Sequence, residues 1–95
     1  MDDWPFDQAP DVAAITSAAV LDGSPILLVV HYSEDDSWAF LEGDHFEATD
    51  GRVIGMKTAI GIDPTLAGIA DLSPGWVARR DFVGGSWTRE ADPSV

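Results

Sequence analysis

The chain has 95 residues, of which 45% are hydrophobic, contains no cysteine and carries a formal net charge of −12. A chain of this length forms one domain, so residues 1–95 exclude a second independent core. Without cysteine there are no disulfides and no thiolate metal ligands, which suits a reducing cytoplasm. We expect a cytoplasmic protein, because no apolar run approaches 18 residues and the first residues lack a secretory signal.

The negative charge is concentrated in the first half of the chain. Residues 1–50 hold twelve carboxylates and no Lys or Arg, whereas residues 51–95 hold five carboxylates and five basic residues. Such a field repels phosphate backbones and anionic membranes, so we expect neither a nucleic-acid nor a membrane partner. It attracts a basic protein, although the same charge would also serve solubility alone.

The N-terminal third begins with an irregular arm. Prolines within residues 1–10 predict this arm, and its aromatic residues Trp4 and Phe6 are available to pack against the body. Residues 11–16 are a weak strand candidate, and Ser17 can cap a helical turn over residues 17–21.

The next segment is predicted to form a hairpin and then a third strand. Residues 26–32 are apolar on both faces, which predicts a central strand. The polar residues 33–36 then form the turn of a hairpin whose second strand is residues 38–41, with Trp38 and Phe40 on one face. Residues 42–51 form a polar loop before a further strand over residues 52–56.

One main helix is expected after these strands, over residues 63–72. Asp63 can cap it and Pro64 fits its first position. Apolar residues at spacings of four, three and three form its buried face, namely Ile62, Leu66, Ile69 and Leu72.

The C-terminal segment has the pattern of a hairpin. Its strands are residues 76–80 and 86–90, joined through Gly84 and Gly85, and residues 91–95 are expected to fray. The order of strands, helix and strands lacks a βαβ alternation, so the predicted fold is α+β. We expect an antiparallel sheet of four or five strands with the helix on one face.

Two histidines, His31 and His45, are the first candidates for chemistry. With nearby carboxylates they could bind a metal or serve a small hydrolytic enzyme, but only if the fold brought them together. The pair Asp44 and His45 with Ser33 or Ser37 has the residue types of a catalytic triad but no nucleophile elbow. Hydrogen-bonded or surface histidines are the competing interpretation, and no cofactor is predicted.

The acidic residues of the first half form the second candidate site. The loop from Glu42 to Asp50 resembles a calcium loop in composition but lacks the ligand order of an EF-hand. We therefore assign its carboxylates to a partner-binding surface together with those of the hairpin turn. The candidate partner-binding residues are Glu34, Asp35, Asp36, Glu42, Asp44, Glu47 and Asp50.

Large aromatic residues offer a third possibility. Trp38, Phe40, Trp76 and Trp87 are expected to fill the core of so small a domain. If some are instead exposed beside Arg79 or Arg89, they would mark an interface, because Trp and Arg dominate binding hot spots.

Several of these residues also carry a family resemblance, which spans residues 12–90. The relevant segments are Val20-Leu21-Asp22-Gly23-Ser24-Pro25, Trp38-x-Phe40, Asp63-Pro64, Gly75-Trp76 and Gly84-Gly85-x-Trp87. Together they resemble a small bacterial domain family of unknown function whose relatives are grouped with immunity proteins of polymorphic toxin systems. The resemblance implies a protein that neutralises a toxin by binding it, and it implies no catalytic residue.

The sequence therefore predicts a non-enzymatic binding module that offers an acidic surface to a basic protein. A small metal-dependent or hydrolytic enzyme using His31 and His45 is the alternative. Self-association through a sheet edge or an exposed aromatic residue is a third possibility, and the oligomeric state stays open.

Overall fold

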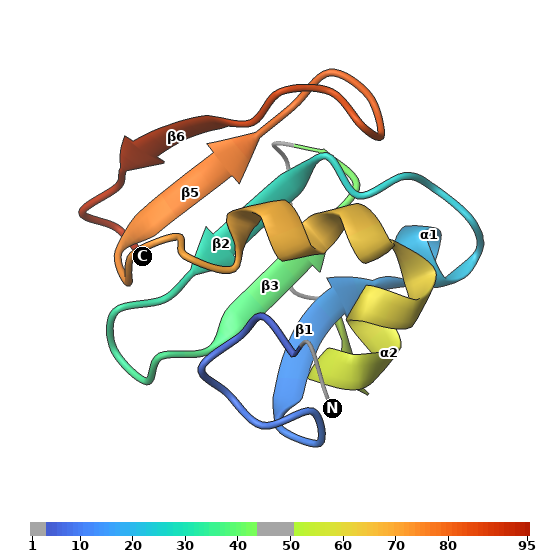
Figure 1. Ribbon diagram of the computed structural model, residues 1–95, viewed down its shortest axis with the longest axis horizontal. Helices are drawn as coiled ribbons and strands as arrows, with labels where there is room; N and C mark the ends of the chain where they lie inside the picture. The colour runs from blue at the N-terminus through green and yellow to red at the C-terminus, as the bar shows by residue number, and fades with distance from the viewer. Residues whose placement is uncertain (1–3, 44–50) are drawn as a thin grey trace.

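The computed structural model describes residues 4–43 and 51–95 and shows a six-stranded mixed sheet with helices on one face (Figure 1). The sheet order is β4-β1-β3-β2-β5-β6. In chain order the elements are β1 Ala13–Ser17, α1 Ala18–Leu21, β2 Leu28–His31, β3 Trp38–Leu41, β4 Gly51–Gly55, α2 Met56–Ile62, the 3-10 helix η2 Pro64–Ile69, β5 Trp76–Arg79 and β6 Thr88–Ala91. The predicted α+β class is confirmed.

The sheet differs from the expected one in strand number and direction. It has six strands rather than four or five, and β1 runs parallel to β3 while every other neighbouring pair is antiparallel. The prediction of a purely antiparallel sheet is therefore wrong. That prediction was based on turns between strands that are neighbours in the sequence. β1 instead pairs with β3 and β4, which are distant in the sequence, and no turn connects them to it directly.

The two predicted hairpins are confirmed, since β2 pairs with β3 and β5 pairs with β6. β2 lies between β3 and β5, and all four of its residues are buried. This is the central position that its continuous apolar run predicts.

The predicted position of the main helix is wrong. The longest helix is α2, seven residues that precede Asp63, while the segment expected to be α-helical is the 3-10 helix η2. The spacing of the buried residues explains the difference, because Leu66 and Ile69 of η2 and Leu72 after it recur every three residues, the period of a 3-10 helix. Ile62, which fits only a period of 3.6, is 41% exposed.

The caps were predictable. Asp63 Oδ1 accepts a hydrogen bond from the backbone N–H of Thr65 at 2.9 Å and begins η2. Ser17 Oγ accepts from the N–H of Val20 at 3.2 Å and begins α1. Both caps satisfy helix N–H groups that have no partner inside the helix.

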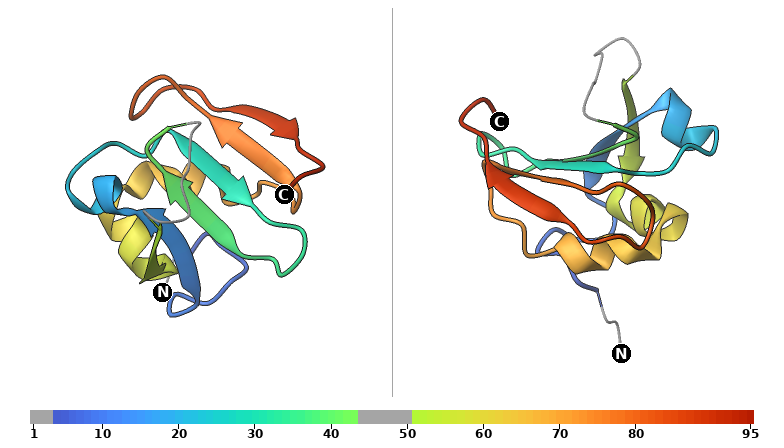
Figure 2. Two further views of the ribbon diagram at one scale, coloured as in Figure 1. Left: turned by 180° about the vertical axis from the view of Figure 1, so that it is seen from behind. Right: turned by 90° about the horizontal axis from the view of Figure 1, so that it is seen from above.

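The main core lies between the sheet and the layer formed by α2, η2 and the N-terminal arm (Figures 1 and 2). Trp38 and Phe40 of β3 are its largest fully buried rings. Phe6 of the arm is 5% exposed and meets Trp38 edge-on, with ring centroids 5.0 Å apart. The arm is thus a part of the core at this point.

A second apolar cluster lies on the opposite face of the sheet. It consists of Leu28, Val30, Ala39, Leu41 and Val77. Val95 packs against this cluster, and its carbonyl accepts a hydrogen bond from Ser33 Oγ at 2.8 Å. The C-terminal residues 92–95 therefore turn back onto the end of the sheet.

Candidate functional site

The turn between β2 and β3 holds three of the predicted partner-binding residues, Glu34, Asp35 and Asp36, all exposed. Asp35 Oδ1 accepts hydrogen bonds from the N–H of Ser37 at 3.1 Å and from its hydroxyl at 2.6 Å. These bonds, the hydroxyl first, lower the pKa of Asp35 below its ordinary value. The carboxylate is fixed in one direction and stays ionised in mild acid.

A second acidic turn has the same local design. After β6, Asp92 Oδ1 accepts from the N–H of Ser94 at 2.9 Å and from its hydroxyl at 2.6 Å, which lowers the pKa of Asp92. The two segments share the pattern Asp-x-Ser, in which a short side chain closes a turn on the backbone.

Gly75 connects these two turns. Its N–H donates to the carbonyl of His31 at 2.7 Å, and its carbonyl accepts from the N–H of Asp92 at 2.8 Å. A φ of 83° at this position favours glycine, and a Cβ would lie 3.6 Å from Cβ of Ser33. The glycine thus holds the acidic turns side by side at the end of the sheet.

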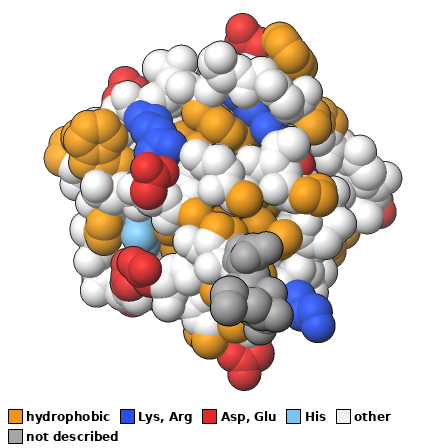
Figure 3. Space-filling view, in the orientation of Figure 1, with side chains coloured by type: hydrophobic (Ala, Val, Ile, Leu, Met, Phe, Trp, Pro, Cys, Tyr) orange, Lys and Arg blue, Asp and Glu red, His pale blue; other side chains and the backbone are white. Residues whose placement is uncertain are grey.

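Trp76, the first residue of β5, lies next to both turns. It is opposite His31 in one neighbouring strand and opposite Ala91 in the other, and 38% of it is exposed. We call Glu34, Asp35, Asp36, Asp92 and Trp76 the acidic end. Figure 3 shows acidic side chains beside the histidine on this part of the surface. Within the described residues, no Lys or Arg forms an ion pair with any of its four carboxylates.

The remaining predicted partner-binding residues are not part of this end. Glu42 follows β3 at the other end of the β2–β3 hairpin, and the four residues of β3 between them span about 13 Å. Glu42 is half-buried and accepts a hydrogen bond from Ser17 Oγ at 2.5 Å. Asp44, Glu47 and Asp50 lie outside the described residues.

His31 is buried, and both of its ring nitrogens are occupied. Nδ1 lies 2.7 Å from the carbonyl of Leu72, and Nε2 lies 2.6 Å from Asp36 Oδ1. The ring stacks on Trp38 with centroids 4.0 Å apart. No nitrogen of His31 is left for a metal or a substrate. His45 lies outside the described residues, among which no group of three metal-ligating side chains occurs.

The serines considered for a catalytic triad are also hydrogen-bonded. Ser33 Oγ donates to the carbonyl of Val95, and Ser37 Oγ donates to Asp35. Neither hydroxyl forms a hydrogen bond to His31, the histidine that the structure describes, which would be the base of a nucleophilic serine. Their partner in that hypothesis, the pair Asp44 and His45, lies outside the described residues.

A buried ion pair that the sequence did not indicate joins η2 to the sheet. The side chain of Arg80 is 0% exposed and contacts Asp63 Oδ2 at 2.5 Å, and the side chain of Asp63 is 7% exposed. Arg80 also donates to the carbonyl of Ile26 and the hydroxyl of Thr65, and its guanidinium lies 4.2 Å from the ring centroid of Trp87. Every donor direction that the arginine uses ends inside the protein, so the cluster is structural. Arg79 and Arg89, which were considered as neighbours of an exposed tryptophan at an interface, form ion pairs with Glu90 and Asp71.

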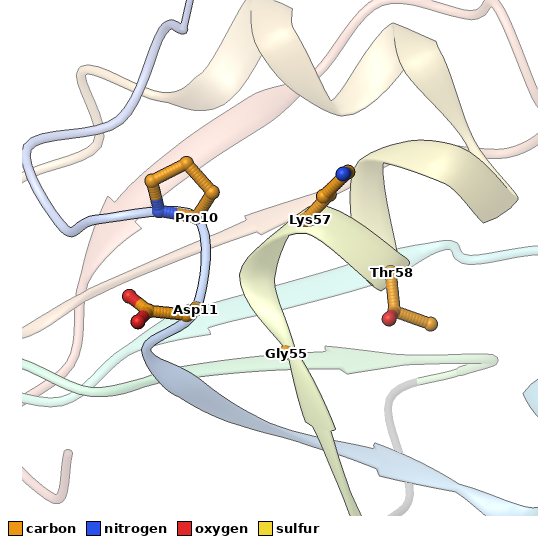
Figure 4. A pocket seen from close by; sticks show the side chains of 5 residues that line it. All are labelled: Pro10, Asp11, Gly55, Lys57 and Thr58. Atoms are coloured by element: carbon orange, nitrogen blue, oxygen red, sulfur yellow. The ribbon is translucent and has the colours of Figure 1, made fainter.

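A shallow hollow lies between the arm and α2, lined by Pro10, Asp11, Gly55, Lys57 and Thr58 (Figure 4). Asp11 and Lys57 come from opposite sides of it. One cation and one carboxylate do not make the convergent set of polar groups that small-molecule sites have. The glycines between β5 and β6 serve the turn that joins these strands. Gly84 has a φ of 88°, a backbone conformation that favours glycine.

Comparison of the chain with models of protein families finds no match, and neither curated proteins nor solved structures give one. The resemblance to immunity-type families therefore stays a prediction. Among the described residues, no helix has the length and apolarity to cross a bilayer.

Proposed function

We propose that the protein is a binding module whose acidic end receives a positively charged segment of a protein partner. The observation that supports this proposal is that two Asp-x-Ser turns, joined through Gly75, each fix a carboxylate at the end of the sheet where a partly exposed tryptophan lies. Fixed carboxylates lose little side-chain entropy on binding, and this lowers the cost of association.

Trp76 would add an aromatic contact to the ion pairs of the acidic end. Exposed rim charges mainly steer association, whereas a buried aromatic anchor contributes most of the binding energy. The face of a tryptophan also attracts Arg and Lys side chains. A basic partner can therefore combine ion pairs to the four carboxylates with a contact on this ring.

The family resemblance is compatible with this proposal, since immunity proteins act by binding a toxin. Under it the partner would be a toxin with a basic surface, and self-association through the acidic end would be opposed by like charges.

Charge variants with a matched control test the proposal. The variant Glu34→Lys/Asp35→Asn/Asp92→Asn changes the net charge by as much as the control Asp22→Lys/Asp11→Asn/Asp81→Asn, whose residues are exposed elsewhere. Asn keeps the oxygen that accepts the turn hydrogen bonds. Wild type and control should retain a basic protein from host lysate, and the acidic-end variant should lose it.

Salt and the tryptophan provide the second arm. Retention should weaken as added salt shortens the Debye length from about 10 Å to 3 Å, and Trp76→Ala should weaken it at every salt concentration. Equal capture by the two charge variants, or capture insensitive to salt, would refute the proposal.

A further inference from the structure

Both ring nitrogens of His31 face oxygen atoms that can only accept hydrogen bonds. The carbonyl of Leu72 lies 2.7 Å from Nδ1, and the carboxylate of Asp36 lies 2.6 Å from Nε2. A neutral imidazole has one N–H and one lone pair, whereas an imidazolium has two N–H groups. Only the imidazolium satisfies both contacts when Asp36 is ionised.

The surroundings of the ring leave little room for another arrangement. His31 is 5% exposed, and its ring is stacked on Trp38 with an interplanar angle of 15°. A lone pair on Nε2 would point at the carboxylate, and one on Nδ1 would point at the carbonyl. Losing the proton therefore sets two acceptors against each other at a ring that is 7% exposed, and the 60% exposed carboxylate of Asp36 is the partner that can turn away toward water.

We propose that His31 is held as the imidazolium at neutral pH and that its proton latches the β2–β3 turn and the N-terminal arm in place. This inference concerns regulation of the acidic end, so its biological meaning rests on the proposed function. The latch itself belongs to the free protein and can be measured without a partner.

Asp36 connects the proton to the arm. Its backbone has a φ of 62°, in the left-handed region that aspartate adopts more readily than most residues with a Cβ. Gln8 Nε2 donates to Asp36 Oδ2 at 2.8 Å and to its carbonyl at 3.1 Å.

Gln8 extends the same chain of contacts into the core. Its side-chain oxygen accepts from the indole N–H of Trp38 at 2.8 Å, and its backbone carbonyl accepts from that of Trp4 at 2.6 Å. If Asp36 moves away from a neutral His31, Gln8 loses both of its bonds to Asp36. The arm then keeps the packing of Phe6, the two indole bonds and the bond from the N–H of Lys57 to the carbonyl of Pro10.

Among residues 4–43 and 51–95, Asp36 is the one carboxylate that forms an ion pair with the ring. The turn also carries Glu34 and Asp35, and the arm carries Asp7 next to Gln8. Asp71 precedes Leu72 but pairs with Arg89 of β6 at 2.8 Å. β3 and β5 contribute the uncharged Trp38 and Trp76.

The test observes the ring nitrogens directly. In the variant His45→Gln, which leaves His31 as the single histidine, ¹⁵N NMR distinguishes a ring with two N–H groups from a ring with one. We expect most His31 rings to carry both protons at pH 7.5, where an ordinary histidine is about 10% protonated. A ring with one N–H at that pH, including one whose partner Asp36 holds the proton, would overturn the proposal.

Two turn variants separate the latch from a general effect of charge. Asp36→Asn removes the counter-ion of His31 but keeps an acceptor, whereas Asp35→Asn removes the same charge one residue away. Asp36→Asn should lose the second ring proton under the conditions in which wild type keeps it, and should lower the protection of the Trp4 and Trp38 indole N–H groups from exchange about tenfold. Asp35→Asn should change neither, and equal effects of the two variants would refute the latch. None of these readouts depends on a partner, so the latch and the proposed binding function can fail separately.

Discussion

Two polar clusters of this protein differ in how far they are buried. Both join the helix side of the sheet to a neighbouring segment, the Asp63–Arg80 cluster through η2 and the His31–Asp36 cluster through the β2–β3 turn. In the first pair the side chains are 0% and 7% exposed, whereas in the second the histidine is 7% exposed and the carboxylate 60%.

This difference separates a fixed clamp from a titratable contact. Arginine side chains stay charged in proteins, and the two side chains of this pair are 0% and 7% exposed, so the pair lasts as long as the fold does. Asp36 reaches solvent, and histidine is the side chain that gains or loses a proton near neutral pH. The same kind of ion pair therefore holds the fold in one place and can respond to solution conditions in the other.

The largest expected effect is on the buried clamp. Arg80→Met leaves the carboxylate of Asp63 buried without its partner, so the free energy of unfolding should fall by about 3–5 kcal/mol in urea denaturation. Arg79→Met is the matched control, because Arg79 pairs with Glu90 at the surface, and it should cost about 1 kcal/mol or less.

The double variant Asp63→Asn/Arg80→Met sharpens this prediction. Asn removes the buried charge and keeps the oxygen that caps η2, so part of the lost stability should return. Equal losses in Arg80→Met and Arg79→Met would show that burial does not distinguish the two arginines.

The half-open cluster should respond less. Gln8→Ala removes the exposed bridge between Asp36 and Trp38, and a net loss of about 1 kcal/mol is expected, the usual size for such hydrogen bonds. Asp7→Ala, at the exposed neighbouring position, should stay within about 0.5 kcal/mol of wild type. Urea denaturation of both variants at one pH provides the measurement, and a loss in Gln8→Ala as large as that in Arg80→Met would contradict the comparison.

Features decided within a few residues were predictable from the sequence. Asp63 caps η2 through Thr65, two residues away, and Ser17 caps α1 through Val20. The hairpins followed from turn residues between apolar runs. Leu66 and Ile69 of η2 and Leu72 after it recur every three residues, the period of a 3-10 helix, but adding Ile62 gave the appearance of an α-helix.

Features that depend on contacts between residues distant in the sequence were not predictable. Nothing in the sequence near β1 indicates that it runs parallel to β3, because the paired residues Ile15 and Ala39 are separated in the sequence by β2 and its turn. Arg79 and Arg80 look alike in the sequence, yet only Arg80 lies beyond the end of β5, where the carbonyl of Ile26 and the side chain of Asp63 meet it. The acidic end likewise depends on Gly75, which brings together turns that are more than fifty residues apart.

The smallest expected effect is a shift in titration at the acidic end. The hydroxyl of Ser37 is the main cause of the lowered pKa of Asp35, so Ser37→Ala should raise the pKa of Asp35 toward its ordinary value, with the remaining N–H of residue 37 holding it slightly below. A carboxyl with a lowered pKa stabilises the fold at higher pH and loses that contribution as pH falls through its folded-state pKa, so the variant should lose less stability in acid than wild type. Carboxyl ¹³C NMR can follow Asp35 and Asp92 together, and Ser94→Ala should shift the pKa of Asp92 in the same direction while leaving Asp35 unchanged. If either serine variant moved both carboxyls, the two turns would be coupled electrostatically, and the acidic end would act as one site rather than as two turns held side by side by Gly75.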